Sequence, residues 1–190
     1  MLSRSGLIFL VLTGCLAPAL AQFPIPTGRD EELARPAQIR ELVSKFCRLE
    51  YEGARLDPQG WSRFEPVVWW KTNPEYAQMD VVSRFTVDEP TEDHGKYEVM
   101  VHYRLIGGYD LNAGYAPEPG AVQNVEYTVT YENAAWKIAS AENTSPHVSK
   151  AAMLKWLNSK LASSEDANAK VLFQAAVQKL QAPATAAPQR

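Results

Sequence analysis

Cysteine is nearly absent from this chain of 190 residues, which contains only Cys15 and Cys47. Cys15 lies in a leader that we expect to be cleaved, which would leave Cys47 as the single cysteine of the mature protein. A single cysteine excludes an intramolecular disulfide, so the fold must be held by its hydrophobic core. Cys47 follows Phe46 in a helical pattern of apolar residues, a position typical of a small buried side chain.

Long apolar runs and an excess of positive charge are also missing. A membrane-spanning helix needs about 20 apolar residues, and the sequence has no such run, so we predict no transmembrane segment. The formal net charge of −3 gives no reason to expect a nucleic acid or an anionic membrane as a partner. The histidines lack the spacing of metal ligands, and we therefore predict no metal site and no cofactor.

The first 21 residues have the pattern of an export signal. Arg4 precedes a short apolar core, and Ala19-Leu20-Ala21 is a small-x-small sequence that a signal peptidase cuts ahead of Gln22. Within the same segment, Leu12-Thr13-Gly14-Cys15 resembles the lipobox of bacterial lipoproteins, in which the cysteine is lipidated. We expect an exported protein of the periplasm, the cell envelope or the extracellular space, and both secretion and a lipid anchor on Cys15 stay open.

Composition divides the rest of the chain into one domain and two flanking segments. Residues 22–35 contain proline, glycine and mixed charge without periodicity, so we predict a flexible tether. Residues 182–190 are rich in alanine and proline and are predicted to be a disordered tail. Residues 36–181 remain, which suits a single domain.

The apolar periodicity within this domain changes from helical to alternating and back. Apolar residues at three- and four-residue steps predict a helix from Pro36 to Gly53, and Asp57-Pro58 opens a short second helix. Alternating apolar residues then predict about four strands, around 81–88, 97–106, 125–132 and 136–138. A glycine-rich loop is expected from 107 to 120, and two helices follow Ser145-Pro146. This order indicates an α+β fold with a mainly antiparallel sheet.

On each predicted strand one face carries most of the apolar side chains, the odd-numbered residues on the first three strands and the even-numbered ones on the last, and we expect this face to point inward. The set contains no acid, no histidine and no lysine or arginine, because His102, Arg104 and Lys137 fall on the opposite, wetted face. Its members are Ser83, Phe85, Tyr97, Val99, Val101, Tyr103, Leu105, Val125, Tyr127, Val129, Tyr131, Trp136 and Ile138.

The order of elements over about residues 36–140 resembles the nuclear transport factor 2-like superfamily, which includes ketosteroid isomerase, scytalone dehydratase and SnoaL-type cyclases. The resemblance rests on an amphipathic first helix, a short proline-started helix and a strand meander that ends at Trp136-Lys137-Ile138. The segments Phe46 to Trp70 and Ser145-Pro146-His147-Val148-Ser149 are also similar to uncharacterised exported bacterial proteins. The resemblance implies a cone-shaped, curved antiparallel sheet covered by the N-terminal helices, extra C-terminal helices, and homodimerisation through the outer sheet face.

Two functions are compatible with such a cone. The first is a non-enzymatic binding or interaction module whose aromatic interior takes a small apolar ligand, unless the rings fill the cone completely. Its ligand contacts would be Tyr97, Tyr103, Tyr127, Tyr131 and Trp69. The alternative is a small isomerase- or dehydratase-like enzyme, because the superfamily's enolising enzymes use inward carboxylic acids. Its site would combine Glu50 or Asp80 with Tyr103 or Tyr127.

The simplest interpretation of both carboxylates is structural. Glu50 stands beside Arg48 on what we take for a solvated helix face, and Asp80 stands at a strand end. We therefore favour the non-enzymatic module and predict no acid–base centre. Ionisable side chains that point into the cone would contradict this preference.

Overall fold

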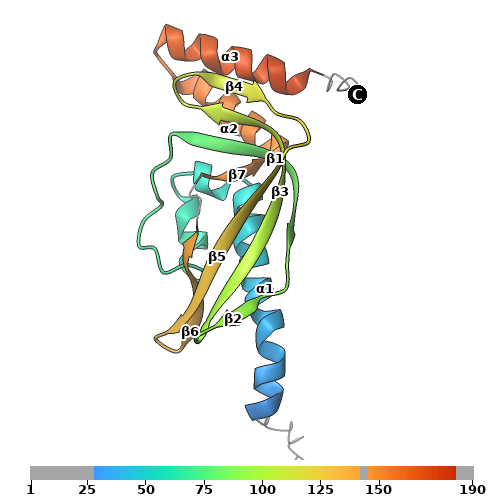
Figure 1. The fold of residues 1–190 in the computed structure, drawn as a ribbon. Coiled ribbons are helices and arrows are strands. Elements are labelled where there is room, and N and C mark those ends of the chain that lie inside the picture. The colour runs from blue at the N-terminus through green and yellow to red at the C-terminus, as the bar shows by residue number, and fades with distance from the viewer. Residues whose placement is uncertain (1–27, 142–144, 183–190) are drawn as a thin grey trace, which may run out of the picture.

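The computed structural model describes residues 28–141 and 145–182, which form an α+β protein built on one strongly curled sheet (Figure 1). The α+β class is confirmed, and the curled sheet agrees with the predicted cone. The predicted leader with Cys15, and the predicted tail apart from Ala182, lie outside the described residues. None of the described helices is both long and apolar enough to cross a membrane.

Three α-helices and two short 3-10 helices are found in the described residues. The helices are α1 (Gly28–Tyr51), η1 (Ala54–Leu56), η2 (Gly60–Arg63), α2 (Lys150–Ser163) and α3 (Ala167–Gln181). Helix α1 begins inside the segment 22–35 that composition predicted to be a tether, and Pro36 lies in its interior. Residues 31–34 are good helix formers, a signal that the tether prediction overlooked, although Pro36 cannot donate a backbone hydrogen bond within the helix.

The sheet has seven strands, of which five form the path β6-β5-β3-β1-β7, while β2 and β4 pair with β3. The strands are β1 (Gln78–Val87), β2 (Thr91–Asp93), β3 (Lys96–Asp110), β4 (Gly114–Pro117), β5 (Val122–Glu132), β6 (Ala135–Ala141) and β7 (His147–Ser149). Strand β7 runs parallel to β1, so the sheet is mixed, but its other strand pairs are antiparallel, in agreement with the mainly antiparallel sheet that the sequence predicted.

The predicted loop from 107 to 120 is largely strand, because β3 continues to Asp110 and pairs with β4. Gly107 permits this pairing, since a Cβ there would lie 2.4 Å from the hydroxyl oxygen of Tyr115. Glycine carries no apolar side chain, so the alternation that reveals a strand is lost in this segment.

Two irregularities in the pairing of β1 with β3 change which residues face the cone. The register shifts leave Ile106 of β3 and Ser83 of β1 without a partner. An unpaired extra residue reverses the alternation of side chains beyond it. Asp80 and Val82 therefore lie on the same face as Tyr103, although simple alternation would place both on the wetted face.

The predicted inward residues of β3 and β5 are buried from Tyr97 to Leu105 and from Val125 to Val129, as is Ile138 of β6. Phe85 and Trp136 are partly buried against the same core. The prediction is wrong for Ser83, which is exposed at the irregularity, and for Tyr131, which is 55% exposed at the end of β5.

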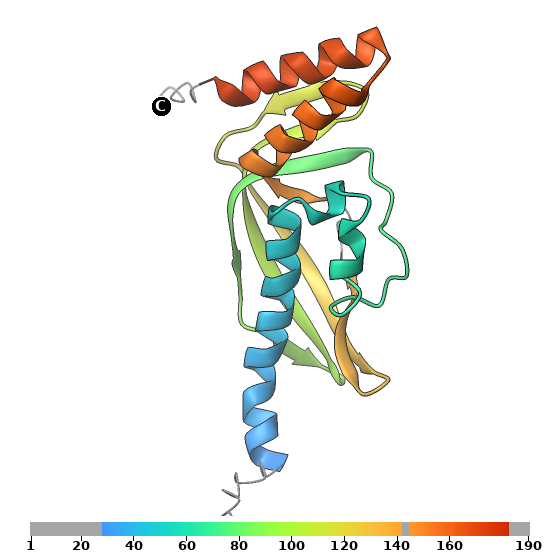
Figure 2. The same cartoon turned by 180° about the vertical axis from the view of Figure 1, so that it is seen from behind.

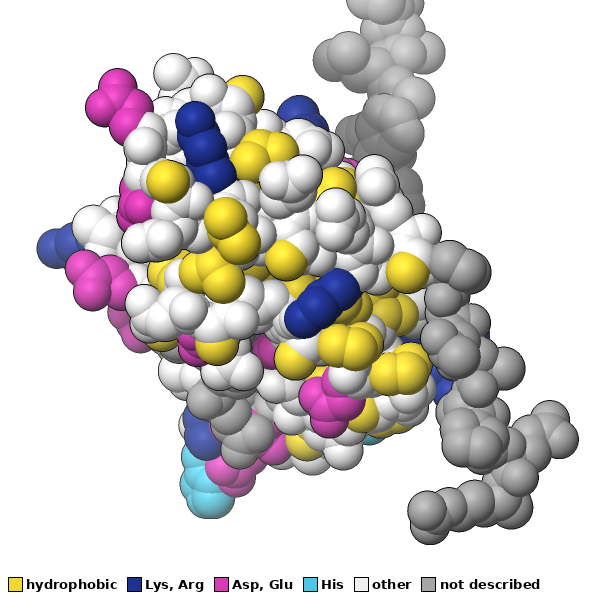
Figure 3. Space-filling view, turned by 90° about the horizontal axis from the view of Figure 1, so that it is seen from above, with side chains coloured by type: hydrophobic (Ala, Val, Ile, Leu, Met, Phe, Trp, Pro, Cys, Tyr) yellow, Lys and Arg dark blue, Asp and Glu magenta, His cyan; other side chains and the backbone are white. Residues whose placement is uncertain are grey.

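Two hydrophobic clusters hold the elements together. In the larger one, Ile39, Val43 and Phe46 of α1 pack against the inward residues of β3 and β5, and Figure 2 shows α1 lying along the curled sheet. The smaller one joins α2 and α3 to the other end of the sheet. Figure 3 shows hydrophobic side chains at the surface of this end, and the exposed Leu111 and Val171 belong to its β3–β4 turn and to α3.

Candidate functional site

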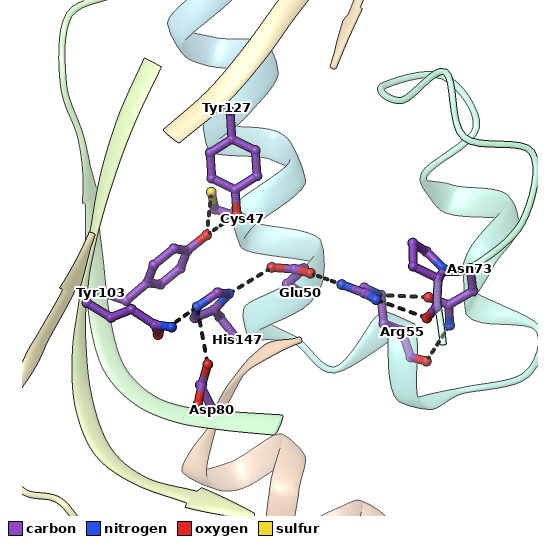
Figure 4. Close-up of polar contacts among 10 residues, drawn as sticks. Cys47, Glu50, Arg55, Asn73, Asp80, Tyr103, Tyr127 and His147 are labelled. Atoms are coloured by element: carbon purple, nitrogen blue, oxygen red, sulfur yellow. Dashed lines mark hydrogen bonds and ion pairs between the residues drawn. The ribbon is translucent and has the colours of Figure 1, made fainter. Parts of the chain in front are cut away.

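Four ionisable side chains are buried inside the cone and meet in one place (Figure 4). Glu50, Arg55, Asp80 and His147 have exposed fractions of 1%, 3%, 7% and 0%. We call them the interior polar cluster. The expectation that the interior holds no acid, histidine or arginine is therefore wrong, and so is the solvated position expected for Glu50.

Each member comes from a different element. Glu50 belongs to α1, Arg55 to η1, Asp80 to β1 and His147 to β7. Glu50 lies four residues beyond Phe46, so the helical repeat puts it on the buried stripe of α1. The sequence therefore contained a signal for Glu50 that we interpreted wrongly.

Arg55 is the counter-ion of Glu50 and also binds the loop that contains Asn73 and Pro74. Its Nη1 donates to Glu50 Oε1 at 2.7 Å, its Nε to Asn73 Oδ1 at 2.9 Å and its Nη2 to the carbonyl of Pro74 at 3.3 Å. Gly53, with φ of 81°, lets the chain leave α1 and return with Arg55 at this position. The guanidinium is thus fully engaged, and only Oε2 of Glu50 is left to interact elsewhere.

The imidazole of His147 lies between the two carboxylates. Its Nδ1 is 3.5 Å from Glu50 Oε2, and its Nε2 is 3.6 Å from Asp80 Oδ2 and 3.0 Å from Gln123 Oε1. The ring stacks on Tyr103, with centroids 3.7 Å apart and an angle of 10° between the planes. These contacts fix the position of the ring, and both of its nitrogens face oxygen atoms.

Glu50 Oε2 and His147 Nδ1 are both buried without a hydrogen-bond partner. A buried polar atom that lacks a partner costs about 1–3 kcal/mol. The two atoms face each other at a distance only slightly longer than a hydrogen bond. A small movement would bring them within hydrogen-bond distance of each other.

Two tyrosines and Cys47 extend the cluster as neutral groups. The hydroxyl oxygen of Tyr103 lies 2.8 Å from that of Tyr127 and 3.0 Å from the sulfur of Cys47. Burial raises the pKa of both tyrosines well above 10 and raises the pKa of the Cys47 thiol. All three therefore stay protonated, so the tyrosines are hydrogen-bond donors and Cys47 is the small buried side chain that the sequence predicted.

The other predicted ligand contacts do not join this site. Tyr97 is six residues from Tyr103 along β3, about 20 Å away, and its hydroxyl donates to Glu92 Oε2 at 3.1 Å. Tyr131 is largely exposed. Trp69 is half-buried and donates from Nε1 to the hydroxyl of Thr130 at 3.1 Å. The structure therefore brings together only Tyr103 and Tyr127 of the five.

Aromatic rings pack tightly around the site. Phe46 meets Phe64, Trp70 and Tyr127 edge to face, with centroid distances of 5.4, 5.8 and 5.5 Å. Two surface grooves of the described residues, one of about 420 Å³ between α1 and β1 and one of about 470 Å³ between η1–η2 and α2, are not lined by any member of the cluster.

His102 lies on the wetted face of the sheet, as predicted. Its Nδ1 is 2.7 Å from Asn124 Oδ1 and its Nε2 is 2.9 Å from Asp88 Oδ2. The hydrogen bond with Asn124, followed by that with Asp88, raises the pKa of His102 above its usual 6.5. This histidine supplies a second, exposed site against which the buried one can be compared.

Sequence reasoning missed Arg55 and His147 as site residues. His147 was taken for the start of a helix, but it forms a three-residue strand with Val148 and Ser149 before α2 begins. Arg55 stands in a short turn without periodicity, and we find no signal for it. In the part of the chain that the structure describes, no three His, Cys, Asp or Glu residues are arranged to hold a metal ion.

Comparison with protein-family models, with curated proteins and with solved structures found no match to this chain.

Proposed function

We propose that the interior polar cluster is an acid–base site and that the chain is a small enzyme of the isomerase or dehydratase class, built on a cone of the nuclear transport factor 2-like kind. The observation that carries the proposal is the position of His147 between Glu50 and Asp80 inside an aromatic interior. Proton transfer at carbon needs a base held away from water and a donor for the oxygen that gains charge.

The roles follow from the contacts. Glu50 Oε2 or His147 Nδ1 accepts the proton from the substrate carbon and the pair then returns a proton to the product, since these are the two polar atoms of the cluster that lack partners. Asp80 and Gln123 hold the other ring nitrogen and so orient the imidazole. Tyr103 and Tyr127 place protonated hydroxyl groups beside the cluster, because burial raises the pKa of both well above 10.

The cost of the cluster supports a chemical role. Burial of charges costs several kcal/mol per ion, and apolar residues of similar volume often stabilise a fold at least as well as a buried ion pair. Glu50 and Arg55 are almost completely enclosed, and a partnerless oxygen adds to the cost. Proton transfer provides a reason for this arrangement that packing alone does not provide.

The proposal can be tested without knowledge of the natural substrate. Cyclic ketones in D₂O exchange their α-protons when a base removes them, and NMR measures the rate. We expect exchange with at least one ketone of a panel, and a loss of a hundredfold or more in Glu50→Gln or His147→Gln, which is the size of a general acid–base contribution. His102→Gln, on the wetted face, is the matched control and should leave the rate unchanged. Absence of exchange throughout the panel, or equal rates in all variants, would refute the proposal.

The tight aromatic packing favours a second candidate, a non-enzymatic exported binding or interaction module. In this case the cluster has a structural role, which is to hold α1, η1, β1 and β7 together, and the protein binds its partner through surface residues. A small apolar ligand and the homodimer through the outer sheet face belong to this candidate, whereas export by residues 1–21, with a lipid anchor on Cys15 as the alternative to cleavage ahead of Gln22, is proposed for both. The ketone assay separates the two, because a structural cluster gives no exchange.

A further inference from the structure

Among the described residues, strand β1 has no neighbouring strand on one side of its second half. Strand β7 pairs with it only from Asp80 to Val82, so the edge from Ser83 to Val87 is open on that side. On the other side β1 pairs with β3, and the amide of Asp88 donates to the carbonyl of Met100. This bond shows which residues of β1 direct their N–H and C=O toward β3. Because such bonds alternate along an antiparallel strand, the N–H and C=O of Phe85 and Val87 point away from β3.

Helix α1 runs beside this edge, and its side chains bond to two of the carbonyls (Figure 2). The hydroxyl of Tyr51 donates to the carbonyl of Ser83 at 3.1 Å, and Nε of Arg40 donates to that of Val87 at 3.1 Å. Phe85 lies between these two contacts. The helix side chains therefore leave its outward N–H and C=O available, together with the N–H of Val87.

The groove of about 420 Å³ between α1 and β1 lies at this place. Its lining combines the edge residues with one side of the helix, namely Ala37, Arg40, Glu41, Ser44, Arg48, Phe85, Val87 and Glu89. The small side chains of Ala37 and Ser44 leave room on the helix side, and the half-buried ring of Phe85 offers an apolar contact. A free strand edge beside a helical wall is an arrangement to which an extended peptide can add as a further strand.

Two arginines and two glutamates line the groove, and one of the arginines is only loosely paired. Arg40 is paired with Glu89 at 2.7 Å. The side chain of Arg48 is 59% exposed, and its ion pair with Glu41 is long, at 3.8 Å. A carboxylate on a bound peptide would give this guanidinium a shorter, charge-assisted hydrogen bond.

We propose that the groove between α1 and β1 binds an extended segment of another protein, which pairs its backbone with Phe85 and places an acidic side chain against Arg48. This docking site is separate from the interior polar cluster and does not depend on the proposed enzymatic function. Its affinity would come from main-chain hydrogen bonds and its specificity from the acidic residue.

The test uses a display library of random twelve-residue peptides, selected on the mature protein. The affinity of each selected peptide is then measured by fluorescence polarisation. Arg48→Glu should weaken binding at least tenfold. Phe85→Pro should do the same, because proline removes the outward N–H while the ladder to β3 does not use it. Arg63→Glu, an exposed arginine in the other groove, is the matched control and should bind as the wild type does.

Circular dichroism establishes that each variant is folded, and Arg48→Glu keeps the test valid if Phe85→Pro does not fold. Selection of acidic peptides whose binding depends on Arg48 and Phe85 supports the proposal. A library without binders, or binders that ignore both substitutions, overturns it. Analytical ultracentrifugation addresses another occupant: a dimer that Arg48→Glu converts to a monomer would assign the edge to a second copy of this chain and would also overturn the proposal.

Discussion

Truncation of Tyr127 measures how completely the cone is filled. The side chain is 1% exposed, its ring packs on Phe46 with centroids 5.5 Å apart, and its hydroxyl oxygen lies 2.8 Å from that of Tyr103. Truncation of a buried aromatic ring to alanine costs about 3–5 kcal/mol. We expect Tyr127→Ala to lower the free energy of unfolding by that amount, and Tyr127→Phe to lower it by about 1 kcal/mol, because only a hydrogen bond is lost.

Urea unfolding followed by tryptophan fluorescence measures both changes. The control is Tyr131→Ala, which truncates the same residue type on the same strand and the same nominal face. Tyr131 is 55% exposed and contacts Trp136, so its truncation should cost about 1 kcal/mol or less. Equal costs at Tyr127 and Tyr131 would mean that the ring of Tyr127 lines an open pocket, and the argument for a filled cone would be refuted.

Three further predictions concern the sheet, the pH dependence of stability and the N-terminus. Gly107→Ala should destabilise the fold by about 1–3 kcal/mol through overpacking, whereas Gly108→Ala, whose Cβ would lie 3.9 Å from its nearest neighbour, should be nearly neutral in the same urea assay. The pKa of His102 is higher in the folded than in the unfolded protein, so its protonated imidazole stabilises the fold fully below pH 6.5. This contribution is lost as the pH rises through the folded-state pKa. Unfolding curves of His102→Gln between pH 5.5 and 8 should therefore show a weaker pH dependence than those of the wild type. Mass spectrometry of the exported protein should find an N-terminus at Gln22 or a lipidated Cys15, and intact Met1 on most of the protein in a cytosolic fraction would contradict the export proposal.

The sequence could predict the burial of those site residues that lie in a regular helix or in an uninterrupted strand. Tyr103 and Tyr127 are buried because β3 and β5 alternate without interruption between them. The burial of Cys47 follows from the apolar stripe of α1 in the same way. Glu50 shares that stripe, and its burial was missed because an acidic residue was assumed to lie in water.

The rest of the site depends on features that have no local signature. Asp80 reaches the interior because the unpaired Ser83 interrupts the alternation of β1, and such an irregularity depends on the pairing of two strands. His147 reaches it from a three-residue strand that pairs with β1 across more than 60 residues of sequence. Arg55 depends on acceptors in another loop. These are long-range contacts, which a pattern of neighbouring residues does not encode.

The contacts of the two carboxylates also determine how the enzyme proposal should be tested. Loss of the Glu50 charge leaves Arg55 buried without its counter-ion, which costs several kcal/mol. A slower reaction in Glu50→Gln therefore has two causes, lost chemistry and a disturbed fold. Asp80 makes no ion pair with an arginine or a lysine in the described structure, and its side chain is 10% exposed. Asp80→Asn keeps an oxygen beside His147 and should leave the free energy of unfolding almost unchanged. A slower proton exchange in this variant, at unchanged stability, therefore reports on the orientation of His147 and not on the packing of the cone.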